Sequence, residues 1–273
     1  MSNENFKVLG NGVKIPLIGY GTYLLENNSN TTDLVKNAIK TGYRHIDTAA
    51  IYGNEEAVGK AIKESNVSRE DIFLVSKVWN TSQGYESTMK AFDKSLKNLD
   101  TEYLDLYLIH WPKELSKDTW KAFEYLYNEK KVKAIGISNF MENHIEDLLT
   151  VATITPMINQ VELHPRLSQK ELSKYCLEKD IQLEAWSPLM QGHILNIKEL
   201  SEVSKRYNKT VAQIVLRWNI QRGIVTIPKS SNLIRIESNF DIFDFELSKE
   251  DMEIINNLDT GKRIGPDPNN FNF

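Results

Sequence analysis

Four residues within the first 110 positions have the types and spacing needed for acid–base chemistry. Asp47 follows a short strand-like run, and Tyr52 lies in the loop behind it. Lys77 ends the next strand-like run, and His110 follows the third. A tyrosine has an ordinary pKa of about 10, and a neighbouring cation makes it a better proton donor. These residues therefore predict a site at which a phenol gives up a proton.

Each of these residues also has an ordinary structural interpretation. Asp47 could cap a turn, Tyr52 could be a surface aromatic, and Lys77 could pair with a helix acid. His110, next to Trp111, could be a half-buried histidine. Packing alone does not readily place polar groups at the same end of successive strands, so the joint pattern favours a functional site.

The elements that must position these residues alternate between strand and helix patterns along the chain. Asn11-Gly12 between apolar runs predicts a hairpin of segments 6–9 and 13–15. Asn54 is the predicted N-cap of the helix at 55–64, whose first turn is acidic. Strands are predicted at 17–20, 44–46, 73–76, 104–109, 134–137, 157–161, 182–185 and 225–227. Helices are predicted at 33–40, 55–64, around 88–99, around 120–127, and at 145–150, 169–178, 197–207, 210–221, 233–239 and 249–257.

Short strands that alternate with helices over this length predict an α/β protein, a single (β/α)8 TIM barrel domain spanning residues 1–273. The hairpin would close one end, and extra helices would lie near the C-terminus. Catalytic residues of such barrels lie at the C-terminal ends of the strands. The alternative, a doubly wound sheet, normally has G-x-G-x-x-G after its first strand. Here Gly19-Tyr20-Gly21 is followed by Leu24 in the position of the third glycine.

Composition narrows the class of protein. The chain has 273 residues, 41% of them hydrophobic, and no apolar run near the roughly 18 residues of a membrane helix. The N-terminus lacks the features of a signal peptide. A net charge of −4 with scattered basic residues disfavours nucleic acid as a partner. Cys176 is the one cysteine, which suits a reducing compartment. We therefore expect a soluble, cytoplasmic protein, with no metal site and with a small molecule as its partner.

Eight motifs in order carry a resemblance to a known family. They are IGYGT at 18–22, HIDTAAIYGNE at 45–55, SKVWN at 76–80, DLYLIHWP at 105–112, IGISNF at 135–140, NQVELHP at 159–165, AWSPL at 185–189 and IPKS at 227–230. From about residue 6 to residue 270, the chain resembles the aldo-keto reductases. The resemblance implies a (β/α)8 barrel that binds an extended nicotinamide cofactor across the strand ends and reduces carbonyl groups. The family's catalytic tetrad falls on Asp47, Tyr52, Lys77 and His110.

Physical roles can be argued for this tetrad. Tyr52 would give the proton to the carbonyl oxygen. Lys77, as an ammonium, would lower the pKa of Tyr52, and Asp47 would hold Lys77 in place. His110, as a neutral imidazole, would orient the carbonyl.

The resemblance also implies the contacts of the cofactor. Trp186 matches an aromatic that stacks on the nicotinamide. Lys229, Ser230 and Arg235 match the group that binds an adenosine 2′-phosphate, so NADPH (NADP+) is predicted rather than NADH. Asn239 matches an adenine contact, whereas Ser238 stands where many members have an acid. The other matching positions are Gly21, Thr22, Asp47, Ser138, Asn139, Gln160, Ser187, Pro188, Leu189 and Ile227.

Three aromatic residues on loops after strands are expected to line the substrate pocket with Tyr52 and His110. They are Tyr23, Trp79 and Trp111, and the tail at 261–273 is expected to fold over the opening. Two loops, between Trp111 and Trp120 and after Leu189, are short. Short loops resemble the bacterial glyoxal and diketo-gulonate reductase members of the family. We therefore expect an open site for small aldehydes, ketones and dicarbonyls such as methylglyoxal, in a monomer.

Two other functions remain compatible with the residues. One is a non-catalytic barrel subunit that senses NADPH. The other is a barrel aldolase or isomerase in which Lys77 forms a Schiff base, which would require an unprotonated amine beside Asp47.

Overall fold

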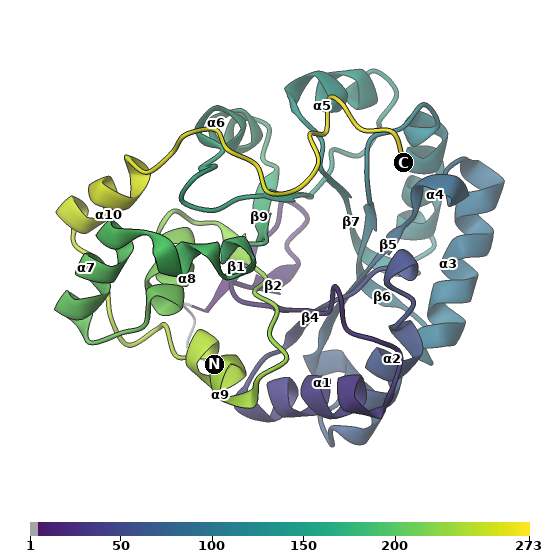
Figure 1. Ribbon diagram of the computed structural model, residues 1–273. Coiled ribbons are helices and arrows are strands. Elements are labelled where there is room, and N and C mark those ends of the chain that lie inside the picture. Colours follow the sequence, from purple (N-terminus) through teal and green to yellow (C-terminus); the bar gives the residue numbers. More distant parts are fainter. Residues whose placement is uncertain (1–4) are drawn as a thin grey trace.

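The structure is a computed structural model that describes residues 5–273, and a curved parallel sheet lies at its centre (Figure 1). Within this part of the chain the sheet has eight strands in the hydrogen-bonded order β10-β9-β8-β7-β6-β5-β4-β3. Each strand thus pairs with its neighbour along the chain, and the pairs are parallel. The strands are β3 (Tyr20–Gly21), β4 (His45–Asp47), β5 (Phe73–Val78), β6 (Leu104–Ile109), β7 (Val132–Ser138), β8 (Ile158–Glu162), β9 (Gln182–Trp186) and β10 (Val225–Thr226).

The sheet closes on itself between β10 and the residues before β3. Ile18 and Thr226 form a parallel bridge. The amide of Thr226 donates to the carbonyl of Leu17 at 3.0 Å, and the amide of Gly19 donates to the carbonyl of Thr226 at 2.9 Å. The predicted (β/α)8 barrel is therefore confirmed. The predicted strand at 17–20 divides into this bridging segment and the short β3.

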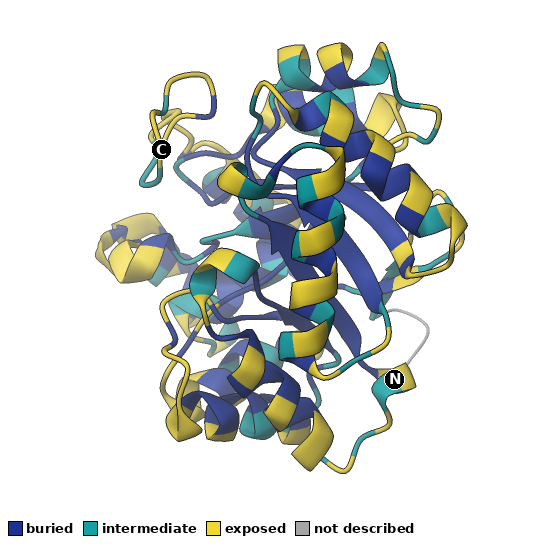
Figure 2. Cartoon of the chain, turned by 90° about the vertical axis from the view of Figure 1, so that its right-hand side faces the viewer, coloured by how far each residue is buried: buried dark blue, intermediate teal, exposed yellow. Residues whose placement is uncertain are grey.

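Helices form the outer layer of the barrel. They are α1 (Ser29–Thr41), α2 (Glu55–Glu64), α3 (Tyr85–Leu99), α4 (Ser116–Asn128), α5 (Glu142–Leu149), α6 (Lys170–Glu178), α7 (Lys198–Tyr207), α8 (Val211–Gln221), α9 (Leu233–Phe240) and α10 (Lys249–Asn256). Figure 2 shows a buried stripe on the helices where they face the strands and an exposed face outside. This amphipathic pattern is what the apolar periodicity of the sequence predicts. Within the described residues, no helix has both the length and the apolar character needed to cross a bilayer.

The N-terminal hairpin covers the N-terminal end of the barrel, as predicted. Its strands are β1 (Phe6–Val8) and β2 (Lys14–Pro16), and Phe6 pairs with Pro16. At its turn, the Asn11 amide donates to the carbonyl of Lys133, near the start of β7, at 2.9 Å. Ile15 points into the core and is fully buried. The opposite, C-terminal end of the barrel is therefore the end left for a site.

The C-terminal tail lies across this opposite end (Figure 1, yellow). The amides of Ile264 and Gly265 donate to the two oxygens of the Glu162 carboxylate, at 2.6 Å and 3.2 Å. The amides of Thr260 and Lys262 donate to the carbonyl of Arg166, at 3.1 Å and 3.0 Å. The prediction that residues 261–273 fold over the opening is confirmed.

A substitution at Gly19 tests how tightly the barrel closes. A Cβ atom at this position would lie 2.7 Å from the His45 ring and 2.8 Å from Cγ2 of Ile227. We expect Gly19→Ala to reduce the free energy of unfolding by about 1–3 kcal/mol, because the extra methyl overpacks a filled core. Urea denaturation measures the change. Gly10→Ala is the matched control, since its methyl meets only Asp180, which is exposed and has a movable carboxylate. Equal stability of the two variants would contradict the tight closure.

Candidate active site

A buried ion pair lies at the C-terminal ends of β4 and β5. The Lys77 ammonium donates to both carboxylate oxygens of Asp47, at 2.7 Å and 2.8 Å. Its third hydrogen goes to the carbonyl of Thr48 at 2.9 Å. Asp47 and Lys77 are both buried, so the pair compensates two charges that would each be costly alone. The predicted pairing of Asp47 with Lys77 is present.

Tyr52 and His110 lie beside this pair. Tyr52 ends the short helix η1 (Ala50–Tyr52), and its ring centroid is 5.2 Å from Nζ of Lys77. His110 follows β6, and its ring meets that of Tyr52 edge to face at 5.7 Å. The four residues predicted from three strand ends are therefore gathered in one cluster.

Burial dominates the protonation of the two aromatic groups. It raises the pKa of Tyr52 well above its usual value, and the charge of Asp47 and the nearby Tyr23 add to this. Burial and the charge of Lys77 lower the pKa of His110 well below its usual value, so the imidazole is neutral as predicted. The pKa of Tyr52 is therefore not lowered overall, and the smaller lowering effect of Lys77 stays a prediction. Lys77 directs its hydrogen bonds at Asp47 and Thr48, and the loss of water around the phenol is the larger effect.

Asn54 holds the loop that carries Tyr52. It is not the side-chain N-cap of α2, because its side chain accepts no hydrogen bond from the first turn. Instead the buried amide donates to the carbonyls of Thr22 and Leu25, both at 2.9 Å. Its oxygen accepts from the Thr48 hydroxyl at 2.7 Å. These tertiary contacts replace the local cap and connect the loops after β3 and β4.

Residues predicted to hold a nicotinamide lie next to the cluster of Asp47, Tyr52, Lys77 and His110. The side-chain amide of Asn139 donates to the carbonyl of His110 at 2.9 Å, and its oxygen accepts from Nε1 of Trp186 at 2.8 Å. The Ser138 hydroxyl donates to the carbonyl of Gln160 at 2.7 Å. Nε2 of Gln160 donates to Asp47 at 2.8 Å. Hydrogen bonds thus connect the strand ends of β7, β8 and β9 to the acid–base groups.

The other predicted cofactor positions follow the ends of β3, β9 and β10. Thr22 is buried, and its hydroxyl donates to the carbonyl of Asp47 at 2.9 Å. A Cβ atom at Gly21 would lie 3.1 Å from the carbonyl oxygen of Ile227, so two loops approach closely here. Ser187 has a left-handed φ of 51° and begins a turn in which the Met190 amide donates to its carbonyl. Pro188 and Leu189 form the middle of that turn.

Two cations lie together at the start of α9. Lys229 and Arg235 are exposed, and neither forms an ion pair with a carboxylate in residues 5–273. Partial burial and the like charge of Arg235 lower the pKa of Lys229. Uncompensated cations at a helix N-terminus are a suitable site for a phosphate.

Other residues of α9 complete this end of the site. Asn232 caps the helix by accepting from the Arg235 amide at 3.1 Å, a contact that the asparagine before the helical pattern could have indicated. The Ser230 hydroxyl accepts from the amide of Asn232 at 3.1 Å. Asn239 is buried in α9, and Ser238 is half-buried beside it.

Aromatic rings surround the acid–base cluster. The Tyr23 ring lies 5.1 Å from that of Tyr52, and the Trp79 ring meets His110 edge to face at 5.0 Å. Trp111 is covered by two tail residues that the sequence reasoning missed. Phe271 lies 4.9 Å from Trp111, and Phe273 stacks on Trp79 at 5.8 Å. The aromatic spacing Phe271-Asn272-Phe273 was the one sequence feature that could have indicated them.

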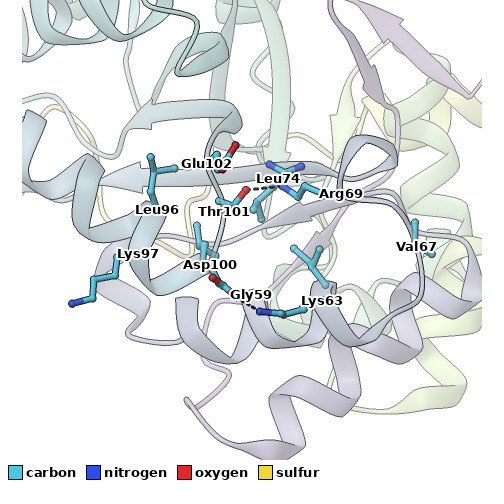
Figure 3. A pocket seen from close by; sticks show the side chains of 12 residues that line it. Gly59, Lys63, Val67, Arg69, Leu74, Leu96, Lys97, Asp100, Thr101 and Glu102 are labelled. Carbon is cyan, nitrogen blue, oxygen red and sulfur yellow. Dashed lines mark hydrogen bonds and ion pairs between the residues drawn. The ribbon is translucent and has the colours of Figure 1, made fainter.

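A separate cavity of about 650 Å³ lies between α2 and α3 (Figure 3). Leu74, near the start of β5, and Thr101, just before β6, belong to its lining. It therefore opens at the N-terminal end of the strands, away from the tetrad. Arg69 in its wall is already bonded to Asp105 and to Thr101, and an ion pair joins Lys63 to Asp100. The charged groups of Arg69 and Lys63 therefore already have partners within the protein.

Comparison with known proteins agrees with this geometry. The model of the aldo/keto reductase family matches residues 17–260. The chain belongs to the aldo/keto reductase family. As a member it is an NADPH-dependent oxidoreductase.

Relatives of known name span nearly the whole chain. It is 58% identical to glyoxal reductase of Bacillus subtilis (strain 168) over 97% of this chain and 96% of the relative. It is 42% identical to methylglyoxal reductase DkgA of Escherichia coli (strain K12), over 99% of each. The fold matches the crystal structure of a mutant of Gox0644 in complex with NADPH, with a TM-score of 0.94 and 38% identity over 100% of both chains.

The Asp47–Lys77 pair predicts an energetic coupling. Lys77→Met leaves a buried carboxylate without its cation and should cost about 3–5 kcal/mol of stability. The double variant Asp47→Asn/Lys77→Met removes both charges and should recover most of that loss, as urea unfolding can measure. Lys36→Met breaks the half-exposed pair of Lys36 with Glu64 and, as the control, should cost less than about 1 kcal/mol. A double variant as unstable as the sum of its single changes would contradict the coupling.

Proposed function

We propose that this protein reduces small aldehydes, ketones and dicarbonyls with NADPH, and that Tyr52 gives the proton. The observation that carries the proposal is the convergence of Asp47, Tyr52, Lys77 and His110 beneath an aromatic wall. Similarity to a glyoxal reductase and to a methylglyoxal reductase supports the substrate class. Three further points stay predictions: that the protein works in the cytoplasm, that the chain is a single domain, and that it is a monomer.

The proposed mechanism assigns each side chain a task. NADPH, when bound, supplies the hydride to the carbonyl carbon. Tyr52 keeps its proton over a wide pH range and gives it to the carbonyl oxygen as negative charge develops there. Lys77, with Nζ 5.2 Å from the Tyr52 ring centroid, offsets the charge left on the phenol, and Asp47 fixes Lys77. His110, as a neutral imidazole, can donate a hydrogen bond to the carbonyl oxygen.

The residues present fit NADPH. Lys229 and Arg235, with Ser230 and the N-terminus of α9, would hold the 2′-phosphate. Trp186 would stack on the nicotinamide, and Ser138, Asn139 and Gln160 would bind its carboxamide. Gly21, Thr22, Ile227 and the turn at 187–189 would hold the pyrophosphate segment, and Asn239 the adenine. Two neighbouring cations without a carboxylate partner are the strongest support, because two like charges held together favour an anionic ligand.

The hydrogen bonds of Lys77 oppose the aldolase alternative. A Schiff base needs an amine lone pair, whereas Lys77 donates all three hydrogens of an ammonium to Asp47 and Thr48. No observation favours the NADPH-sensing subunit. It predicts that NADPH binds without turnover, which the next experiment measures.

Removing the Tyr52 hydroxyl tests the proton donor. Tyr52→Phe should lower turnover of methylglyoxal by about 10²–10⁴-fold, because it removes a general acid, and should leave NADPH affinity nearly unchanged. The decrease in NADPH absorbance measures turnover. Tyr85→Phe on α3 is the matched control and should keep wild-type turnover. A folded Tyr52→Phe protein with most of its activity would exclude Tyr52 as the donor.

Removing the charge of Arg235 tests the choice of cofactor. Charge-assisted hydrogen bonds contribute about 1.5–3 kcal/mol, so Arg235→Ala should weaken NADPH binding by roughly tenfold to a hundredfold. NADH lacks the 2′-phosphate and serves as the internal control, with little expected change. Quenching of tryptophan fluorescence measures both dissociation constants. Equal weakening of the two cofactors would mean that Arg235 supports the adenosine pocket in general.

A further inference from the structure

A second polar network lies beside the acid–base cluster and includes a glutamate that the proposed mechanism does not use. Gln160 on β8 is paired in register with Glu184 on β9. Nε2 of Gln160 lies 2.9 Å from Oε2 of Glu184 and 2.8 Å from Oδ2 of Asp47. All three side chains are buried. The network therefore connects Glu184 to the Asp47–Lys77 pair through one amide group.

These two contacts fix the orientation of the Gln160 amide. An amide group has two hydrogens to donate, and each carboxyl group accepts one of them. The amide oxygen then takes no part in either contact and remains an acceptor for a ligand. Without Glu184, one buried N–H would lose its acceptor, which is a costly state that favours rearrangement of the side chain.

The surroundings of Glu184 favour an uncharged carboxylic acid. Burial, with the negative charge of Asp47 as a second cause, raises the pKa of Glu184 to about 8. The hydrogen bond from Gln160 and the positive charge of Lys77 act in the opposite direction. Oε1 of Glu184 lies 3.3 Å from Nε2 of His45, and neither atom has a hydrogen-bond partner elsewhere in the described residues. Burial also lowers the pKa of His45 to about 4, so the imidazole is neutral. The acid hydrogen of Glu184 can therefore be donated to His45.

We propose that Glu184 is a positioning residue of the nicotinamide site. As an uncharged acid it holds the amide of Gln160 and, through it, Asp47, and it leaves Asp47–Lys77 as the one ion pair of this network. The role rests on the proposed function, because Gln160 is taken to bind the carboxamide of NADPH.

The proposal predicts a link between pH and the form of cofactor preferred. An ionised Glu184 would add negative charge beside Asp47 and stabilise the cationic ring of NADP+ over the neutral ring of NADPH. The 2′-phosphate is common to both and cancels in the ratio of their affinities. The pKa values of His45 and His110 lie below the pH range in which Glu184 ionises, and the pKa of Tyr52 lies above it.

Protein stability gives a second readout that needs no cofactor. The pKa of Glu184 is raised from an ordinary 4.5 to about 8, so between these values the folded chain binds more protons than the unfolded chain. This contribution to stability falls as pH rises through that window. Glu184→Gln cannot ionise, so its stability relative to the wild type should rise over the same window.

Three variants test the proposal. Glu184→Gln mimics the protonated acid, since its oxygen can accept from Gln160 and its amide can donate to His45. Glu184→Leu removes both contacts. Glu55→Gln is the matched control, because Glu55 is also a buried acid but accepts from Ser76 and Asn98, at 2.7 Å and 3.0 Å. Dissociation constants for NADPH and NADP+ are measured by tryptophan quenching on both sides of pH 8.

The expected results differ among the variants. In the wild type, the affinity ratio should shift toward NADP+ by roughly threefold to tenfold as Glu184 ionises, and Glu55→Gln should follow it. Glu184→Gln should keep, at every pH measured, the ratio of NADPH to NADP+ affinity that the wild type has at low pH. Glu184→Leu should bind both forms about tenfold more weakly, the typical effect of one lost hydrogen bond. In the ligand-free wild type, an infrared carboxylic acid band should disappear near pH 8 and be absent from Glu184→Gln.

Other outcomes would overturn the proposal. A pH-dependent ratio that persists in Glu184→Gln, or wild-type affinity in Glu184→Leu, would exclude the positioning role while carbonyl reduction stands. If Glu184→Leu does not fold, the Glu184→Gln ratio and the infrared band decide alone. A wild type that binds no NADPH would instead overturn the proposed function, and the positioning role with it.

Discussion

The buried ion pair of Asp47 and Lys77 is the interaction on which the polar end of this barrel depends. It places a cation 5.2 Å from the centre of the Tyr52 ring without leaving a net charge in a region that excludes water. Asp47 also accepts from Gln160, so the same carboxylate connects the acid–base cluster to the residues expected around the nicotinamide. Removal of either charge would therefore disturb both the core and the proposed chemistry.

Closure of the barrel is the condition for this arrangement. The bridge between Ile18 and Thr226 brings the loops after the first and last strands together, with Gly21 against Ile227. Asn54 then fixes the Tyr52 loop by bonding to Thr22 and Leu25. The tail is held by Glu162 at the same end. Each of these contacts joins segments that are distant in sequence, and together they make a site from loops.

Much of the fold could be predicted from the sequence because local sequence patterns specify its strands and helices. The helix at 55–64 and the strand at 104–109 were predicted with the bounds that the structure has. Short strands such as β3 and β10 were less well predicted, since only two residues of each are paired with the neighbouring strand. The tetrad could be found because Asp47, Lys77 and His110 lie at the C-terminal ends of three strands and Tyr52 lies in the loop after the first of them, and parallel strands bring such positions to one end.

The sequence by itself determined the order of strands and helices, the barrel that they build, and the gathering of Asp47, Tyr52, Lys77 and His110 at one end. Only the tertiary structure decided the use of Asn54 as a tertiary clamp, the raised pKa of Tyr52, and the cover that Phe271 and Phe273 provide. It also decided the hydrogen bond between Gln160 and Glu184. Periodicity and motifs depend on near neighbours in the chain, whereas burial and pairing depend on residues that meet only when the barrel closes.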